Sequence, residues 1–433
     1  MKKQNLWLVL VGLVISMLLV ACSSNESAPS SSENTEEQGT TEETGGETSV
    51  SGDILVWVHP YTGDAVKEEE MWDEIVANFN EEFPDVNVTI ETIPWANRDQ
   101  KILTALAANN GPDVFYAIPD QMPQYADVGM LLELDPYLTE DDLAGFVDTA
   151  LIATKWNDKT YGLPILQEAY TMIYNVDVIN AIGEDPNNLP TTWEEFEVWA
   201  KKAKENGYYA LNYLGGGSMN GTLYPWVWQA GGDVLTPDNE ILINSPESVE
   251  AFEFVNNLYQ NGYIPEDSIT STGQDELWFG GKMMAVLGSG IDLSMLQTEA
   301  DFDYVIGPPL KYREQLTYGT TGMFVVPSNS DNPDAAAEFV KAITNAENQR
   351  IFNTVTQYIP TREEAKDIFD TNEDMKELAQ YTQYALPGVI HPKGRAIMPY
   401  IQAEVQAMMS GEKTPQEAAD AAAAAIEAEL AKP

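Results

Sequence analysis

Several residue types that commonly build functional sites are scarce in this chain. Its 433 residues include one Cys and two His, and 22 Lys and Arg stand against 69 Asp and Glu. A single Cys can form neither a disulfide within the chain nor a Cys-rich zinc site. The formal net charge of −47 excludes an electrostatic nucleic-acid binder, because gripping a phosphate backbone requires clustered cationic side chains.

Motifs for bound nucleotides and for nucleophilic catalysis are also missing. The chain has no G-x-G-x-x-G and no Gly-Lys-Ser/Thr, and Asn220 stands where a third glycine would have to follow Gly215 and Gly217. No Gly-x-Ser-x-Gly presents a serine nucleophile. We therefore expect no cofactor and no metal. Paired carboxylates remain an open alternative, since acidic residues are many and the sequence does not give their separation.

One long apolar run lies near the N-terminus. Leu6 to Val20 is 15 residues long and follows Lys2 and Lys3, which is typical of an export signal and short for a membrane span of about 20 residues. The run ends at Leu19-Val-Ala-Cys22, which resembles the lipobox of bacterial lipoproteins. The resemblance implies a lipid on Cys22 and an extracytoplasmic protein held on the outer face of the cell membrane. An ordinary secretory signal is the alternative.

Residues 23–52 differ sharply in composition from the rest of the chain. Of these 30 residues, 24 are Ser, Glu, Thr or Gly, and none is Lys, Arg or aromatic. Such a segment buries too little apolar surface to offset the entropy lost on ordering. The sequence therefore predicts a disordered acidic tether between residues 1–22 and a folded body.

The body alternates strand and helix patterns. With 44% hydrophobic and 10% aromatic residues it can bury more than one ordinary core, so we expect two domains. Asp53 to Val58, Val86 to Ile90 and Val114 to Tyr116 read as strands separated by helical stripes, which predicts an α/β sheet. Binding loops are then expected at the carboxyl ends of the strands. Further helices are predicted over Pro246 to Gln260 and Ala418 to Leu430.

Seven segments in a fixed order resemble extracellular solute-binding proteins of ABC importers, in the branch that includes maltose-binding protein. They are Phe79 to Val86, Leu103 to Phe115, Tyr161 to Pro164, Tyr174-Asn175, Pro190 to Phe196, Gly231 to Asp233 and Phe279 to Met283. The resemblance implies a two-lobe periplasmic-binding-protein-like α/β fold of type II, with a ligand cleft between lobes joined by a hinge. On this plan one lobe comprises residues 53–164 and 311–357, and the other comprises 165–310 and 358–433.

The resemblance also implies a function. A monomeric, lipid-tethered receptor would capture a mono- or oligosaccharide such as a maltodextrin by lobe closure and deliver it to the membrane permease, without catalysis. The rivals are a surface glycoside-acting enzyme, an adhesin, and a binding protein of the same fold for another solute such as a glycerol phosphodiester. An anionic ligand is less expected because the acidic chain opposes its approach, although Arg98 or Arg395 could reverse this locally.

A sugar pocket needs aromatic plates for C–H faces and polar groups for hydroxyls. In the first lobe, His59, Tyr61 and Asp120 follow predicted strands at their carboxyl ends. The segment from Trp95 to Arg98 resembles a family segment near the cleft. The first-lobe candidates are therefore His59, Tyr61, Trp95, Asn97, Arg98 and Asp120.

Candidates in the second part of the chain rest on the resemblance. Trp226 is expected to stack on a sugar ring, while its neighbour Trp228 is expected in the core. Ser289 stands where many relatives carry an aromatic plate, so a different ligand shape is implied. Arg395 is expected either to bond hydroxyls or to pair with a structural acid. The full set is Glu168, Tyr170, Trp226, Ser289, Thr320 and Arg395.

Overall fold

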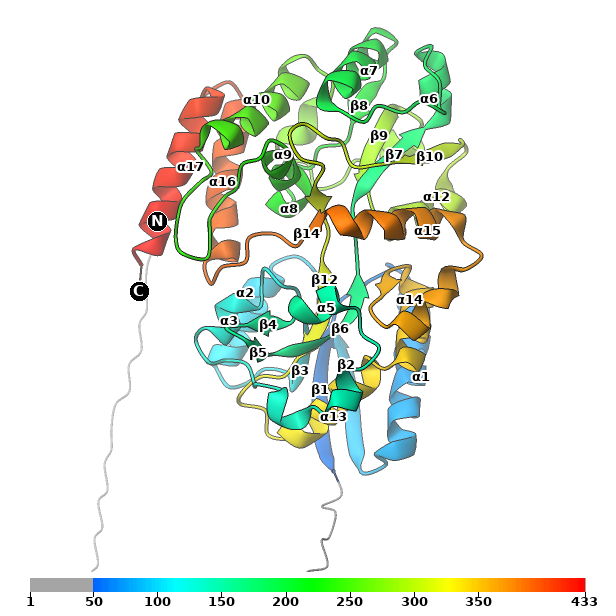
Figure 1. Ribbon diagram of the computed structural model, residues 1–433, viewed down its shortest axis with the longest axis vertical. Helices are drawn as coiled ribbons and strands as arrows, with labels where there is room; N and C mark the ends of the chain where they lie inside the picture. Colours follow the sequence, from blue (N-terminus) through cyan, green and yellow to red (C-terminus); the bar gives the residue numbers. More distant parts are fainter. Residues whose placement is uncertain (1–49, 433) are drawn as a thin grey trace, which may run out of the picture. The chain divides into compact units, whose positions relative to one another are not determined.

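The computed structural model describes residues 50–432, which form one compact unit containing two α/β lobes. Figure 1 shows one lobe built on the blue and cyan N-terminal strands and the other on the green central part of the chain. Three chain segments pass between the lobes. The predicted export signal and residues 23–49 of the predicted tether lie outside the described residues, and Gly52, assigned above to the tether, begins the first strand.

The first lobe contains a six-stranded sheet. Its strand order is β13-β6-β12-β3-β1-β2, in which β2, β1 and β3 are parallel and the other three strands run antiparallel to their neighbours. The strands are β1 Gly52–Val58, β2 Val86–Thr92, β3 Val114–Ala117, β6 Gly162–Gln167, β12 Thr321–Val325 and β13 Ile359–Pro360. The carboxyl ends of β1, β2 and β3 therefore lie together at one edge.

Helix α1 (Ala65–Glu82) illustrates how apolar spacing in the sequence predicts a helix of this lobe. Asp64 caps it by accepting a hydrogen bond from Lys67 N, and Trp72, Ile75 and Phe79 bury the stripe that repeats at three and four residues. The lobe's other helices and its β-hairpin are α2 Arg98–Ala107, α3 Pro123–Ala126, η1 Asp135–Tyr137, α4 Glu140–Leu143, α5 Asp148–Ile152, β4 Lys155–Trp156, β5 Lys159–Thr160, α13 Pro333–Ile343, α14 Ala346–Thr356 and η3 Glu363–Phe369.

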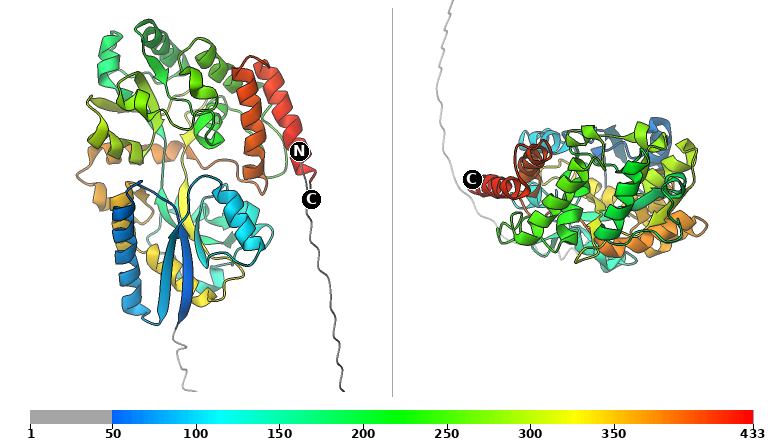
Figure 2. Two further views of the ribbon diagram at one scale, coloured as in Figure 1. Left: turned by 180° about the vertical axis from the view of Figure 1, so that it is seen from behind. Right: turned by 90° about the horizontal axis from the view of Figure 1, so that it is seen from above.

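The second lobe has a smaller sheet and more helix. Its four strands, in the order β10-β7-β9-β8, are β7 Thr171–Asn175, β8 Tyr209–Leu211, β9 Met283–Gly288 and β10 Tyr304–Gly307. Its helices are α6 Val176–Ala181, α7 Trp193–Glu205, α8 Met219–Thr222, α9 Tyr224–Gln229, α10 Pro246–Gln260, η2 Glu266–Ile269, α11 Asp275–Phe279, α12 Gly290–Glu299, α15 Glu373–Gln380, η4 Tyr381–Tyr384, α16 Gly394–Met409 and α17 Pro415–Leu430. Figure 2 shows α16 and α17 packed side by side on this lobe.

The segments that cross between the lobes hydrogen bond to one another. Glu168 and Thr320 exchange backbone N–H···O bonds of 2.9 and 3.1 Å, and Tyr170 N donates to Tyr318 O at 2.8 Å. Gly319 has no room for a side chain, because a Cβ there would lie 2.2 Å from Glu168 O. A short pair, β11 (Thr317–Tyr318) with β14 (Ala385–Leu386), lies beside these crossings.

The lobe boundaries expected at 164/165, 310/311 and 357/358 need correction. Strand β6 continues in the first-lobe sheet to Gln167. Lys311 N donates to Thr191 O at 2.8 Å and so lies with the second lobe. Ile359 pairs with Gln167 in the first-lobe sheet, and η3 packs on α14 of the same lobe. Strand pairing between distant segments decides these positions, and single-sequence patterns do not contain it.

Two absences among residues 50–432 concern the membrane and metal expectations above. No helix there combines the length and the apolar composition needed to cross a membrane. No group of three or more His, Cys, Asp or Glu side chains in that range is placed to hold a metal ion.

Candidate ligand-binding site

A cavity of about 770 Å³ lies between the lobes and takes residues from both. Its size is in the range of small-molecule sites, which run from roughly 300 to 1,000 Å³. The first-lobe side of the lining comprises Tyr61, Trp95, Ala96, Arg98, Tyr116, Ile118 and Tyr358, the crossings add Glu168, Tyr170, Tyr318 and Thr320, and the second lobe adds Asn212, Tyr213, Leu214, Gly217, Ser218, Asn220, Gly221, Thr222, Thr272, Leu287, Ile291 and Arg395.

The first-lobe wall is a cluster of aromatic rings at the carboxyl ends of β1, β2 and β3. The ring of Tyr61 lies edge-on to Trp95 and to Tyr116, with centroid distances of 5.7 and 5.5 Å. His59 stacks under Trp95 at 4.0 Å, and its Nδ1 lies 2.9 Å from Ile93 O. Burial, aided by the charge of Arg98, lowers the pKa of His59 to about 3, so its ring is neutral. His59 supports Trp95 and does not line the cavity.

Apart from Arg395, the second-lobe wall has no charged side chain and combines amide and hydroxyl groups with aliphatic side chains and the ring of Tyr213. Ser218 begins α8 and accepts a bond from Asn220 N through its hydroxyl, which fixes the short helix against the cavity. Asn212 accepts from Leu287 N at 3.0 Å and so sits at the end of β9. Amide and hydroxyl side chains of this kind match a ligand rich in hydroxyl groups.

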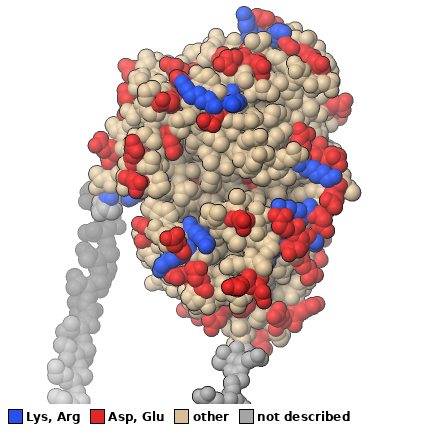
Figure 3. Space-filling model, viewed as in Figure 1, with Lys and Arg blue, Asp and Glu red and all other residues tan. Residues whose placement is uncertain are grey.

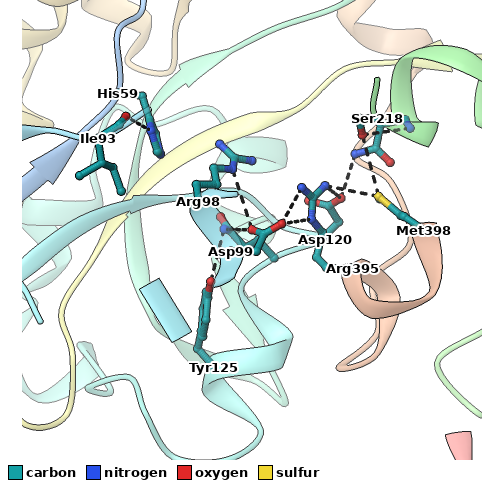
Figure 4. Close-up of polar contacts among 11 residues, drawn as sticks. His59, Ile93, Arg98, Asp99, Asp120, Tyr125, Ser218, Arg395 and Met398 are labelled. Atoms are coloured by element: carbon teal, nitrogen blue, oxygen red, sulfur yellow. Dashed lines mark hydrogen bonds and ion pairs between the residues drawn. The ribbon is translucent and has the colours of Figure 1, made fainter. Parts of the chain in front are cut away.

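Arg98 is the first residue of α2 and is 8% exposed. Its guanidinium lies over the Trp95 ring, 4.9 Å from the centroid, and its Nε is 3.9 Å from an oxygen of Asp99. Within residues 50–432 no hydrogen bond from the Arg98 side chain is made. Figure 4 shows this side chain beside Asp99, at the first-lobe edge of the charged cluster.

Glu168 is the one carboxylate among the described residues that line the cavity. Burial raises its pKa to about 7, while the hydroxyls of Ser289 and Tyr170 and the charge of Arg98 act in the opposite direction. Ser289 lies behind Glu168 as the cap of α12, where its N–H donates to Asp292 at 2.7 Å. Near neutral pH Glu168 therefore exists in both protonation states.

Arg395 joins the two lobes at the rim of the cavity (Figure 4). From α16 of the second lobe it donates to Asp99 through Nε at 3.1 Å and Nη2 at 2.9 Å, and to Asp120 through Nη1 at 3.1 Å. Asn220 of the second lobe also donates to Asp120, at 2.8 Å. Of the two roles expected for Arg395, the structure shows pairing with acids.

The twelve residues expected at the site fall into four groups, the last of which is Trp226 in the core. Seven line the cavity, namely Tyr61, Trp95, Arg98, Glu168, Tyr170, Thr320 and Arg395. His59, Ser289 and Asp120 stand one layer behind it, since each contacts a lining residue without reaching the cavity. Asn97 is exposed on the outer side of α2, because its left-handed backbone (φ 58°) turns the chain there.

The expectation that Trp226 stacks on a ligand is corrected by its packing. The ring is 2% exposed and lies against Trp193 and Phe254 in the second-lobe core, with centroid distances of 6.1 and 5.1 Å. Helix α9, which carries it, is buried at every residue, so Trp228 is also in the core as expected. The aromatic segment packs α9 against α10 instead of facing the cavity.

Sequence reasoning missed several lining residues. Tyr116 ends a predicted strand and could have been found by the rule that selected Tyr61. Tyr318 lies in a crossing and Tyr358 directly precedes β13, and the positions of both depend on distant strand pairing. Asn212 stands in the loop after β8 and Asn220 in the short helix α8, and neither belongs to a motif, so no sequence signal marks them.

The chain resembles known proteins over most of its length. A sequence model described as bacterial extracellular solute-binding protein matches residues 74–385. A putative binding protein of Brucella abortus is 24% identical over 88% of this chain and 94% of its own, and the maltotriose-binding protein of Pyrococcus abyssi is 25% identical over 84% and 79%. An ABC substrate-binding protein of Listeria monocytogenes, solved with cycloalternan, has a TM-score of 0.78 at 23% identity and covers 88% of this chain and 99% of its own. The fold is thus the two-lobe type II fold expected above.

Proposed function

The chain belongs to the bacterial extracellular solute-binding protein family, and we propose that it captures a carbohydrate between its lobes for an ABC importer. The family match covers well over half of the chain. The maltotriose-binding relative and the cycloalternan-bound structural neighbour support a saccharide as the ligand class.

The observation that carries this proposal is a set of buried polar atoms that belong to residues lining the cavity. Four such side-chain atoms make no hydrogen bond within residues 50–432, namely Tyr61 OH, Tyr213 OH, Asn220 Oδ1 and Thr320 Oγ1. A buried polar group without a partner costs about 1–3 kcal/mol, so such groups in a cavity favour a ligand that completes them. Sugar hydroxyls both donate and accept, and the rings of Trp95 and Tyr61 offer apolar faces to the C–H groups.

The two lobes contribute different contacts, so binding depends on both. Only contacts present in the closed state and absent from the open one can shift the equilibrium between them, and a shift from 1:99 to 99:1 requires about 5.5 kcal/mol. Arg395 and Asn220 join the lobes through Asp99 and Asp120 beside the cavity. Closure around a ligand would present one combined surface to the membrane permease.

Two measurements on the purified protein test this function. A thermal-shift screen of neutral and acidic mono- and oligosaccharides should find a stabilising ligand, since a ligand at 100 Kd adds about 2.7 kcal/mol. Small-angle scattering with that saccharide should show a lower radius of gyration on saturation. A panel without any stabilising saccharide, or a radius that stays constant on saturation, would count against the proposal.

We do not assign catalysis to this site. Glycoside hydrolysis commonly needs two carboxyl groups flanking the scissile bond, and among residues 50–432 Glu168 is the single carboxylate lining the cavity. The family consists of solute-binding proteins. Incubation with a bound oligosaccharide should leave it intact, and chromatography would reveal any product.

We propose further that the protein acts as a monomer held at the outer membrane face by a lipid on Cys22. The Leu19 to Cys22 segment supports this, and stable anchoring generally requires more than one acyl chain, as lipoprotein modification supplies. Cys22→Ala should release the protein into the medium or leave it uncleaved. A processed and membrane-bound variant would contradict the lipid anchor.

A further inference from the structure

The charges around the cavity are unequally compensated. Three charged residues line it, Arg98, Glu168 and Arg395. Arg395 makes hydrogen-bonded ion pairs with Asp99 and Asp120, so two carboxylates already surround this guanidinium. The other guanidinium, that of Arg98, has no such partner within the described part of the chain.

The surroundings of Arg98 make this lack of a partner costly. Its side chain is 9% exposed, and among the described residues the only carboxylate oxygen within ion-pair distance is Asp99 Oδ1 at 3.9 Å, beyond hydrogen-bond range. That same oxygen accepts a hydrogen bond from Gln121. A buried charge without a hydrogen-bonded counter-ion is unfavourable, so the protein alone does not satisfy the five donors of this side chain.

The start of α2 adds to the positive potential at the same point. Asn97, the residue before the helix, makes no capping hydrogen bond with its side chain. Ala96 and Arg98 on either side of it line the cavity. Arg98 N donates to Trp95 O at 3.4 Å, and Asp99 already places one carboxylate in the first turn of this ten-residue helix. The positive end of the helix dipole adds to the field of the guanidinium beside it and favours negative charge there.

Glu168 does not neutralise Arg98 in the way that Asp99 and Asp120 neutralise Arg395. No hydrogen bond joins the two side chains, and burial raises the pKa of Glu168 to about 7. A carboxyl group with that pKa carries less than a full negative charge at neutral pH. The charge of Arg98 is therefore only partly compensated by Glu168.

We propose that the saccharide bound here carries a carboxylate, as a uronic acid does, and that Arg98 binds this carboxylate through two parallel N–H···O bonds. This inference rests on the function proposed above and specifies its ligand. The planar guanidinium fork matches the two oxygens of a carboxylate, a geometry that Lys does not provide. A dianionic phosphate fits less well, because Asp99 and Asp120 are close by and, within residues 50–432, only one of the two guanidinium groups lining the cavity lacks a hydrogen-bonded carboxylate.

The acidic surface does not contradict an acidic ligand. Figure 3 shows Asp and Glu side chains scattered over the visible face of the molecule, with few Lys and Arg among them. Salt screens such surface charges over about 8 Å at physiological ionic strength, whereas contacts inside a cavity are screened much less. The net charge therefore slows encounter, and the affinity is set by Arg98 and its surroundings. Added salt should raise the association rate of an acidic sugar.

The test uses saccharide pairs that differ only at C6. Galacturonate with galactose, glucuronate with glucose, and digalacturonate with α-1,4-galactobiose each compare a carboxylate with a hydroxymethyl group. Calorimetric titrations would use the wild-type chain, Arg98→Gln, Arg98→Lys, and Arg313→Gln as a control on the outer surface of the second lobe, where Arg313 pairs with Glu250. We expect the wild type to prefer an acidic sugar by at least about tenfold, consistent with a charge-assisted hydrogen bond.

The variants separate the outcomes. Arg98→Gln should abolish the preference for the acid, Arg98→Lys should retain part of it, and Arg313→Gln should leave it intact. A wild type that binds the neutral member of every pair as tightly as the acid would overturn the carboxylate inference and leave the proposed function standing. If no saccharide of either kind binds, the proposed function fails as well.

A measurement without ligand tests the same point. Because Arg98 is buried without a hydrogen-bonded partner, Arg98→Met should raise the melting temperature of the ligand-free protein. A lower melting temperature would identify Arg98 as a structural group and contradict its assignment to a ligand.

Discussion

The two walls of the cavity use the same residue types in opposite ways. In the first lobe, Tyr61, Trp95 and Tyr116 stand at strand ends and face the cavity. In the second lobe, Trp193, Trp226 and Trp228 are buried among helices, and the wall consists of amides, hydroxyls and aliphatic side chains with Tyr213 as its one aromatic residue among those described. The first lobe therefore offers apolar faces and Arg98, and the second offers hydrogen-bonding groups.

The difference follows from how each lobe builds its core. The first lobe covers a six-stranded sheet, and the loops after three parallel strands remain free to carry rings to its edge. The second lobe has a four-stranded sheet and packs α7, α9 and α10 together, which requires large side chains between helices. A ligand that needs both stacking and hydrogen bonds therefore finds all of its contacts only between the two lobes.

The largest expected effect comes from a second-lobe aromatic that faces the core. Trp226→Ala should lower the free energy of unfolding by about 3–5 kcal/mol, because it leaves a cavity between Trp193 and Phe254. Urea unfolding would measure it. The folded variant should keep its affinity for the saccharide. A loss of affinity with unchanged stability would contradict the assignment of the second-lobe tryptophans to the core.

The second-largest effect should come from removing the contact between the two walls of the cavity. Arg395→Ala removes the counter-charge of Asp99 and Asp120 only when the lobes are closed, and we expect a loss of about 3 kcal/mol in affinity, roughly a hundredfold. Titration calorimetry and scattering would follow it. The matched control is Arg313→Ala, whose exposed pair with Glu250 should contribute less than about 1 kcal/mol to stability and nothing to closure. Equal affinity losses in both variants would contradict a role in closure.

A first-lobe ring should affect binding more than stability. Trp95 is 39% exposed and stacks on His59, so Trp95→Ala should weaken saccharide binding by about 2 kcal/mol with a small change in melting temperature. Trp156→Ala is the control, since this first-lobe Trp lies outside the cavity lining. Unchanged affinity in the Trp95 variant would remove the ring from the site.

The smallest effect concerns pH. The pKa of Glu168 is raised to about 7 in the folded protein from an ordinary value of 4.5, so the folded state binds more protons between these values. Stability should therefore fall as pH rises from about 4.5 to 7. The full shift corresponds to about 3 kcal/mol, which the partial exposure of Glu168 to the cavity reduces to about 1–2 kcal/mol. Glu168→Gln should reduce the dependence of unfolding free energy on pH. The dependence that remains should come from Asp292, whose pKa is about 6. Urea unfolding of the wild type and the variant at three pH values measures this dependence. The same pH dependence in both proteins would argue against a buried Glu168.

Local patterns predicted much of the fold. The helix expected over Pro246 to Gln260 has those bounds, because Ser245 caps it and its apolar stripe has a helical period. The strand predicted at Asp53 begins one residue earlier. The lobe boundaries were placed incorrectly, since β6 and β13 are defined by partners far along the chain.

The sequence did not predict which aromatic side chains face the cavity and which lie in the core. Tyr61 and Trp226 both occur beside turn-forming residues, and nothing in the local sequence states which ring packs inward. Tyr61 lines the cavity because its strand ends at a lobe edge, whereas Trp226 lies on a helix buried on all sides.

The sequence by itself determined the acidic charge, the absence of common cofactor motifs, the alternating α/β elements and the family resemblance, because composition, periodicity and motif order are local properties. Only the tertiary structure decided the lining of the cavity, the pairing of Arg395 with Asp99 and Asp120, and the isolation of Arg98. These features depend on contacts between segments up to 296 residues apart, and burial and charge compensation arise only when such segments meet.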